Sequence, residues 1–153
     1  METLAERMQT LGIELPEAPD RAGMYVQTKR CGNSLYISGC GPSLKGKPDI
    51  TGKLGEISIE EGQEAARRCI LNALAILQRD LGSLERVKSV VKILTFVASK
   101  PDFYNQPKVA DGASKLLVDL FGKEIGCPTR SAIGVAVLPG DIPVEIELLV
   151  ETD

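Results

Sequence analysis

The sequence contains no histidine among its 153 residues. This absence excludes the Ser-His-Asp and Cys-His nucleophile systems and the usual zinc ligand sets, all of which need an imidazole. The four cysteines, at positions 31, 40, 69 and 127, form no C-x-x-C motif. We therefore expect reduced, structural cysteines and no bound metal.

The sequence also lacks long apolar runs and an excess of basic residues. No stretch approaches the roughly 18 apolar residues of a membrane span, and the N-terminal METLAERMQTLG has no apolar signal-peptide core. We therefore expect a cytoplasmic protein without a membrane partner. The net charge of −3 and the isoelectric point near 5.1 argue against a nucleic-acid partner, because gripping phosphates takes clustered Lys and Arg. The glycine-rich segment 39–55 lacks the G-K-[ST] of a phosphate loop.

The length predicts one domain over residues 1–153, with residues 1–15 as an N-terminal helical extension. Two strand-like runs flank Gly32-Asn33, which predicts a β-hairpin. Residues 87–98 predict an interior strand, since apolar residues occupy both of its faces.

Two longer helices are predicted between the strands. The first begins at the capping box Ser58-Ile59-Glu60-Glu61 and ends at Leu81-Gly82. The second spans about residues 109–122 and stops at Gly122. The order is therefore β-β-α-β-α-β-β, an α/β (α+β) fold in which right-handed crossovers place both helices on one face of a single sheet.

Residues 127–151, CPTRSAIGVAVLPGDIPVEIELLVE, predict two strands joined by a tight turn. Side chains alternate between the two faces of a strand. On the first strand, one face is expected to pack under the helices: Ser131, Ile133, Val135 and Val137. The other face is expected to carry Arg130, Ala132, Gly134 and Ala136, together with Glu145 and Glu147 of the second strand. In such a hairpin Glu147 lies opposite Gly134 or Ala136, roughly 13–20 Å from Arg130.

A sheet face of alanine and glycine that no helix covers does not suit open water, so we expect another copy of the chain to cover it. The protein is then a homo-oligomer with sheets packed inward. At the expected separation Arg130 and Glu147 of one chain do not reach the same small molecule. Across an oligomer interface they can, which predicts a site shared between subunits.

Two segments carry a family resemblance. Residues 127–147, CPTRSAIGVAVLPGDIPVEIE, and residues 23–42, GMYVQTKRCGNSLYISGCGP, resemble the RidA/YjgF family of enamine/imine deaminases, and the resemblance extends over about residues 15–151. It implies a chorismate-mutase-like fold, a homotrimer and three clefts between subunits. It also implies hydrolysis of reactive 2-imino or enamine acids to 2-keto acids and ammonia, without a cofactor.

The resemblance assigns roles to individual residues. It makes Arg130 the ligand-binding arginine and Glu147 the glutamate that positions water. It places Tyr25, Ser38, Gly39 and Ala132 in the cleft. The chain departs from the best-known members at Ala132, where they have Cys, at Asp111, where they have Asn, and in the longer segment 99–114. Asp111 is thus a further candidate for the cleft, where its charge could repel a carboxylate ligand.

The residues leave other interpretations open. Arg130 can grip a carboxylate with two parallel hydrogen bonds, or it can pair with Glu145 or Glu147 across subunits. Glu147 can act as a general base, while Glu145 is assigned a structural role. Tyr25 can be a half-buried strand aromatic. The function can accordingly be imine deamination or the non-catalytic binding of a small 2-imino or 2-keto carboxylate; ribonuclease activity is disfavoured by the acidic chain without histidine.

Overall fold

The computed structural model describes residues 1–153, and its element order is the one expected. Two single-turn helices, Leu84–Arg86 and Pro139–Asp141, accompany the main elements. The helices are α1 (Leu4–Leu11), α2 (Ile59–Leu81) and α3 (Gln106–Gly126). The strands are β1 (Thr28–Cys31), β2 (Ser34–Cys40), β3 (Val87–Ala98), β4 (Thr129–Val135) and β5 (Val144–Thr152).

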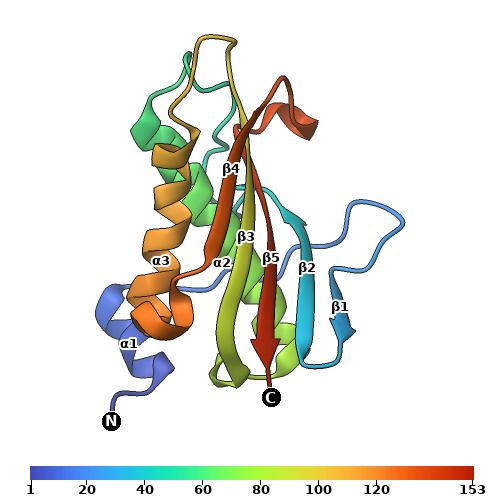
Figure 1. The fold of residues 1–153 in the computed structure, drawn as a ribbon, viewed down its shortest axis with the longest axis vertical. Coiled ribbons are helices and arrows are strands. Elements are labelled where there is room, and N and C mark those ends of the chain that lie inside the picture. The colour runs from blue at the N-terminus through green and yellow to red at the C-terminus, as the bar shows by residue number, and fades with distance from the viewer.

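The five strands form one sheet in the order β1-β2-β5-β3-β4 (Figure 1). β3 and β4 run parallel, and the other neighbours are antiparallel. The expected hairpin between the last two strands is therefore wrong, because β3 lies between them. α3 returns the chain to the starting end of β3, so β4 adds beside β3 as a parallel neighbour. β5, whose helix-facing side chains Val144, Ile146, Leu148 and Val150 are all buried, takes the interior position between β2 and β3.

Local sequence signals placed the helices and the first hairpin correctly. Ser58 and Glu61 form the capping box of α2, and Gly82 ends that helix with a φ of 81°. α3 starts earlier and runs further than expected, but its backbone leaves helical geometry at Gly122, where φ is 80°. The β1–β2 hairpin turns at Gly32-Asn33.

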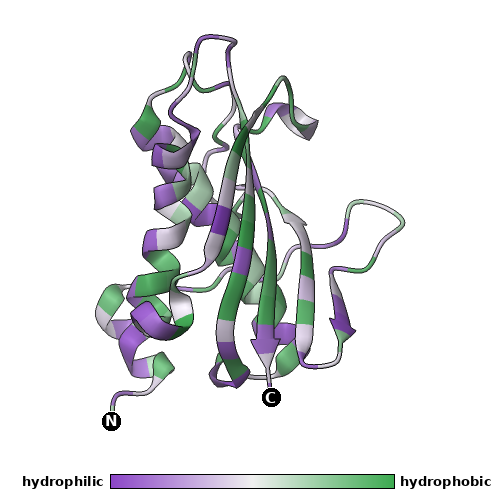
Figure 2. Ribbon diagram, viewed as in Figure 1, coloured by the Kyte–Doolittle hydropathy of each residue, from purple (hydrophilic) through white to green (hydrophobic).

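α2 and α3 cover the same face of the sheet, as expected (Figure 1). The core lies between these helices and the apolar residues that recur along the strands (Figure 2). α1 docks against α3, where Arg7 donates a hydrogen bond to the carbonyl oxygen of Leu120 at 3.1 Å. The other face of the sheet has no helix over it; we call it the open face. No helix is both long and apolar enough to cross a bilayer.

The structure reverses the expected faces of β4. Arg130 pairs with Ile93, which is fully buried under the helices, so Arg130, Ala132 and Gly134 also face the helices. Ser131, Ile133 and Val135 lie on the open face instead. The small residues serve the close approach of α3, since a Cβ on Gly134 would lie 2.7 Å from Gln106 Nε2. Because α3 covers Ala132 and Gly134, these small residues give no reason to expect a second copy of the chain against them.

Candidate functional site

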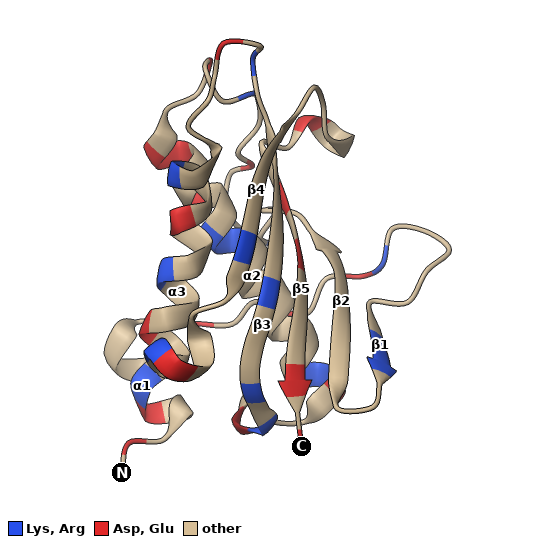
Figure 3. Ribbon diagram, in the orientation of Figure 1, with Lys and Arg blue, Asp and Glu red and all other residues tan.

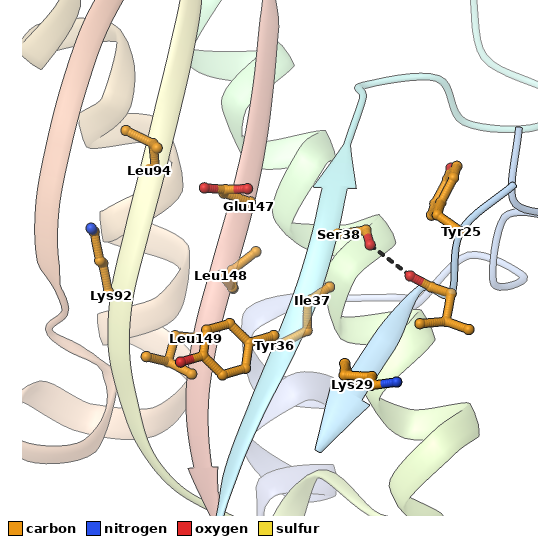
Figure 4. A pocket seen from close by; sticks show the side chains of 11 residues that line it. Tyr25, Lys29, Tyr36, Ile37, Ser38, Lys92, Leu94, Glu147, Leu148 and Leu149 are labelled. Atoms are coloured by element: carbon orange, nitrogen blue, oxygen red, sulfur yellow. Dashed lines mark hydrogen bonds between the residues drawn. The ribbon is translucent and has the colours of Figure 1, made fainter. Parts of the chain in front are cut away.

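The open face holds a groove of about 630 Å³ between the β1–β2 hairpin and the strands β5 and β3 (Figure 4). Three residues assigned to the cleft from the sequence line it: Tyr25, Ser38 and Glu147. Its remaining lining combines apolar side chains with two lysines: Val26, Lys29, Tyr36, Ile37, Lys92, Leu94, Leu148 and Leu149. The groove thus has an apolar floor with charge of both signs at its edges.

A β-bulge shapes the upper end of this groove. Ile37 pairs with Leu148 and Cys40 with Ile146, so β2 carries one more residue than β5 between these pairs. The extra length falls at Ser38 and Gly39, and bulges of this kind redirect side chains. Ser38 Oγ donates to the carbonyl oxygen of Val26 at 2.7 Å, which ties β2 to the segment before β1.

Tyr25 lies in that preceding segment and is 39% exposed. Its hydroxyl accepts a hydrogen bond from the backbone N–H of Ala22 at 3.1 Å. Arg21 Nη1 donates to the carbonyl oxygen of Tyr25 at the same distance. The ring is therefore held at the wall of the groove by contacts within its own loop.

Glu145, for which the sequence predicts a structural role, lies half-buried on the open face beside the bulge. A Cβ on Gly39 would lie 2.8 Å from Glu145 Oε2 and 3.0 Å from Cδ. Gly39 therefore leaves the space that this carboxyl group occupies. Burial raises the pKa of Glu145, and the negative charge of Glu147 raises it further. No cation offsets either effect, so Glu145 is the perturbed acid of this face.

Arg130 lies on the opposite face, away from this group. Its Nη1 donates to Asp111 Oδ1 at 2.8 Å and to Ser114 Oγ at 3.1 Å, both on α3. Ala132 lies on the same helix-covered face, paired with Thr95. β4 is an edge strand, so Arg130 sits at the rim of the sheet.

The predicted residues therefore fall into two groups. Tyr25, Ser38, Gly39 and Glu147 gather on the open face. Arg130, Asp111 and Ala132 lie between β4 and α3. The expectation that Arg130 and Glu147 share one face of the sheet is wrong, because they lie on opposite faces and β3 separates their strands. Acidic residues mark β5, and basic residues mark β3 and β4 (Figure 3). Nowhere do three potential metal-ligating side chains come together.

Comparison with known proteins places this chain in a family. Residues 5–151 match the family described as "YjgF/chorismate mutase-like, putative endoribonuclease". The chain belongs to the RidA/YjgF family. The protein TCP17 of Trypanosoma cruzi is 44% identical over 97% of this chain and 93% of its own length. The 2-iminobutanoate/2-iminopropanoate deaminase of Dermatophagoides farinae is 30% identical over 90% of this chain and 93% of its own.

A solved structure shows the same fold of the RidA/YjgF family. The protein Atu1372 of Agrobacterium tumefaciens, of unknown function, superposes with a TM-score of 0.89 at 39% identity. The superposition covers 98% of this chain and 92% of that one. The agreement extends over nearly the whole chain, so it includes both the open face and the β4 edge.

Proposed function

We propose that the protein hydrolyses reactive 2-imino or enamine acids to 2-keto acids and ammonia, in clefts between the subunits of a homotrimer. The observation that carries the proposal is the half-buried Glu145 carboxyl beside Gly39, whose pKa is raised and which has no cationic partner. Relatives that include a 2-iminobutanoate/2-iminopropanoate deaminase support the same chemistry. The four free cysteines fit a reducing cytoplasm.

For this reaction the protein needs mainly to position the substrate and a water molecule. A protonated imine, R–C(=NH₂⁺)–CO₂⁻, already contains the electrophilic carbon. Water adds to that carbon as a carboxylate takes one of its protons, which gives a carbinolamine. The carboxyl group returns this proton to the nitrogen, the C–N bond breaks as ammonia leaves, and the hydroxyl group loses its proton to become the keto oxygen; ammonia and this proton together make ammonium. A glutamate whose pKa is raised is the stronger base for the first step. Glu145 is the base in this proposal; Glu147, the residue assigned from the sequence, lies in the groove and raises the pKa of Glu145.

The carboxylate of the substrate needs a cation, and Arg130 of the same chain faces the wrong side of the sheet. β4 is an edge strand, however, and its rim is accessible to a neighbouring molecule. In the proposed trimer the β4 edge of one subunit meets the open face of the next. Arg130 of one subunit then holds the substrate carboxylate, while Glu145, Ser38 and Gly39 of the other hold the reacting carbon and the water.

The open face itself supports an oligomer. Tyr36 is 52% exposed and Ile133 43% exposed on it, with Leu94 and Phe96 partly exposed between them. Together with the groove these residues form an apolar surface of the kind that marks protein interfaces. A second copy of the chain on this face would remove that surface from water.

The first test is turnover. 2-Iminopropanoate would be generated in situ by an amino-acid oxidase, and the imine that remains would be trapped with semicarbazide. We expect the wild type to hydrolyse the imine, and Arg130→Ala and Glu145→Gln to lose about 100-fold or more in rate. Glu147→Gln should retain more activity than Glu145→Gln. A greater loss in Glu147→Gln would return the role of base to Glu147.

The second test asks whether the site is shared. Co-expression of Arg130→Ala with Glu145→Gln gives mixed oligomers in which about a quarter of the clefts combine two intact residues. Activity well above that of either variant alone is expected. If mixed trimers form and remain inactive, the two residues do not act in one cleft.

A second candidate function is carboxylate binding without turnover. The observation that favours it is the free Nε–Nη2 edge of Arg130, which can receive a carboxylate whether or not a base acts on the ligand. Well-folded wild type that binds small carboxylates but leaves imines of several sizes unhydrolysed would establish this function instead.

A further inference from the structure

The hydrogen bonds of Arg130 leave one edge of its guanidinium group unused. Nη1 has two hydrogens, and these meet Asp111 Oδ1 at 2.8 Å and Ser114 Oγ at 3.1 Å. No acceptor in the chain meets Nε–H or the two Nη2 hydrogens. Nε and Nη2 form the edge of the group that receives a carboxylate with two parallel bonds. The protein therefore fixes the arginine by one nitrogen and presents the other two.

Asp111 is likewise only half used. Its Oδ1 accepts from Arg130, and Oδ2 has no partner in the chain. The Asp111 side chain is 56% exposed and that of Arg130 is 25% exposed. An open acceptor for a cation thus lies on the Nη1 side of the same guanidinium group whose Nε–Nη2 edge is an open donor for an anion.

The charge of this pair decides what it recognises. An isolated arginine attracts any carboxylate. With Asp111 at 2.8 Å the pair is neutral overall, so a plain carboxylate gains from Arg130 and is opposed by Asp111. A molecule with a cationic nitrogen next to its carboxylate gains from both. When the carboxylate of such a zwitterion binds the open edge of Arg130, the charge of Asp111 attracts its cationic nitrogen.

We propose that Asp111 and Arg130 together form a subsite for zwitterions of the 2-iminium or 2-amino acid type, which Asp111 favours over 2-keto acids. This deepens the deaminase proposal and rests on it for the identity of the substrate. In hydrolysis the substrate carries the cationic nitrogen beside its carboxylate, and the keto acid product has lost it. Asp111 therefore discriminates against the product and speeds its release.

The test is a binding measurement that needs no turnover. 2-Aminobutanoate and 2-oxobutanoate share one carbon skeleton and differ in the cationic nitrogen. NMR titration of the oligomeric protein would measure the affinity of each, for wild type, Asp111→Asn and Ser114→Ala. Wild type should prefer the amino acid about 10-fold or more. Asp111→Asn should weaken the amino acid and tighten the keto acid, shifting the ratio about 10-fold or more toward the keto acid.

Ser114→Ala is the matched control, because it removes the other partner of Nη1 without changing charge. It should weaken both ligands alike and leave their ratio unchanged. A wild type that binds the keto acid as well as the amino acid, or binds neither, overturns the inference, as does an unchanged ratio in Asp111→Asn. Imine turnover is measured separately, so an active enzyme with no zwitterion preference refutes only this subsite. An inactive protein that keeps the preference refutes only the deaminase.

Discussion

The substitution Gly39→Ala tests whether the bulge of β2 exists to accommodate the Glu145 carboxyl group. The added Cβ would lie 2.8 Å from Oε2, 3.0 Å from Cδ and 3.2 Å from Cγ of Glu145. Ordinary contact begins at 3.4 Å, so Oε2 must retreat by about 0.6 Å. The groups that move belong to a half-exposed, flexible side chain rather than to backbone. The fold should therefore tolerate the change.

The rate of imine hydrolysis should fall in Gly39→Ala. A displacement of about 1 Å of a reacting group can cost about 100-fold in rate. A retreat of about 0.6 Å, with the rotation that it forces on Glu145, should therefore cost about 10- to 100-fold. The loss should appear in kcat more than in KM, because the base acts on water and Arg130 holds the substrate.

Imine hydrolysis and thermal unfolding would be measured on Gly39→Ala, Glu145→Gln and the double variant. If the glycine acts through Glu145, Gly39→Ala should lower activity in the wild-type background and add little in the Glu145→Gln background. The unfolding temperature should change by no more than a few degrees. A loss that is equal in both backgrounds would refute the reasoning, since the alanine would then act on something other than the carboxyl group.

Three further predictions follow from single contacts. Because Glu145 works deprotonated and burial and Glu147 raise its pKa, the acid limb of the rate profile should lie above pH 4.5 and move to lower pH in Glu147→Gln. Gly112→Ala should lower the unfolding temperature strongly, because its Cβ would overlap the backbone carbonyl of Gln63 where α3 crosses α2. Ser58→Ala should lower the free energy of unfolding, measured by urea titration, by about 1 kcal/mol, since it removes the cap of α2.

The sequence predicted the elements whose signals are local. The capping box at Ser58, the turn at Gly32-Asn33 and the helix break at Gly122 each depend on a few neighbouring residues, and each is present. The pairing of β4 depends instead on where α3 delivers the chain. A short loop between two strands indicated a hairpin, and nothing within residues 127–151 could reveal that β3 separates them.

The error in pairing carried over to the faces. Alternation correctly separated Arg130 from Ser131, but which set faces the helices is decided by the neighbouring strand. Ile93 and Leu94 supply that answer through their register with β4. The environment of Glu145 could not be predicted from the sequence for a related reason. Its perturbation arises from Gly39 and the bulge, which lie about a hundred residues earlier and reach it only through the pairing of β2 with β5.

Both halves of the site are incomplete in the same way. Glu145 has a raised pKa and no cation to stabilise its charge. Arg130 has two nitrogens without an acceptor, at the edge of the sheet. A buried polar or charged group without a hydrogen-bond partner destabilises the fold, so we expect these groups to gain partners in the assembled oligomer. A neighbour's β4 edge placed against the open face, with a zwitterion between, would give the Arg130 guanidinium group a carboxylate, Asp111 a cationic nitrogen and Glu145 the water on which it acts, which is why we expect ligand binding to stabilise the oligomer as well as the site.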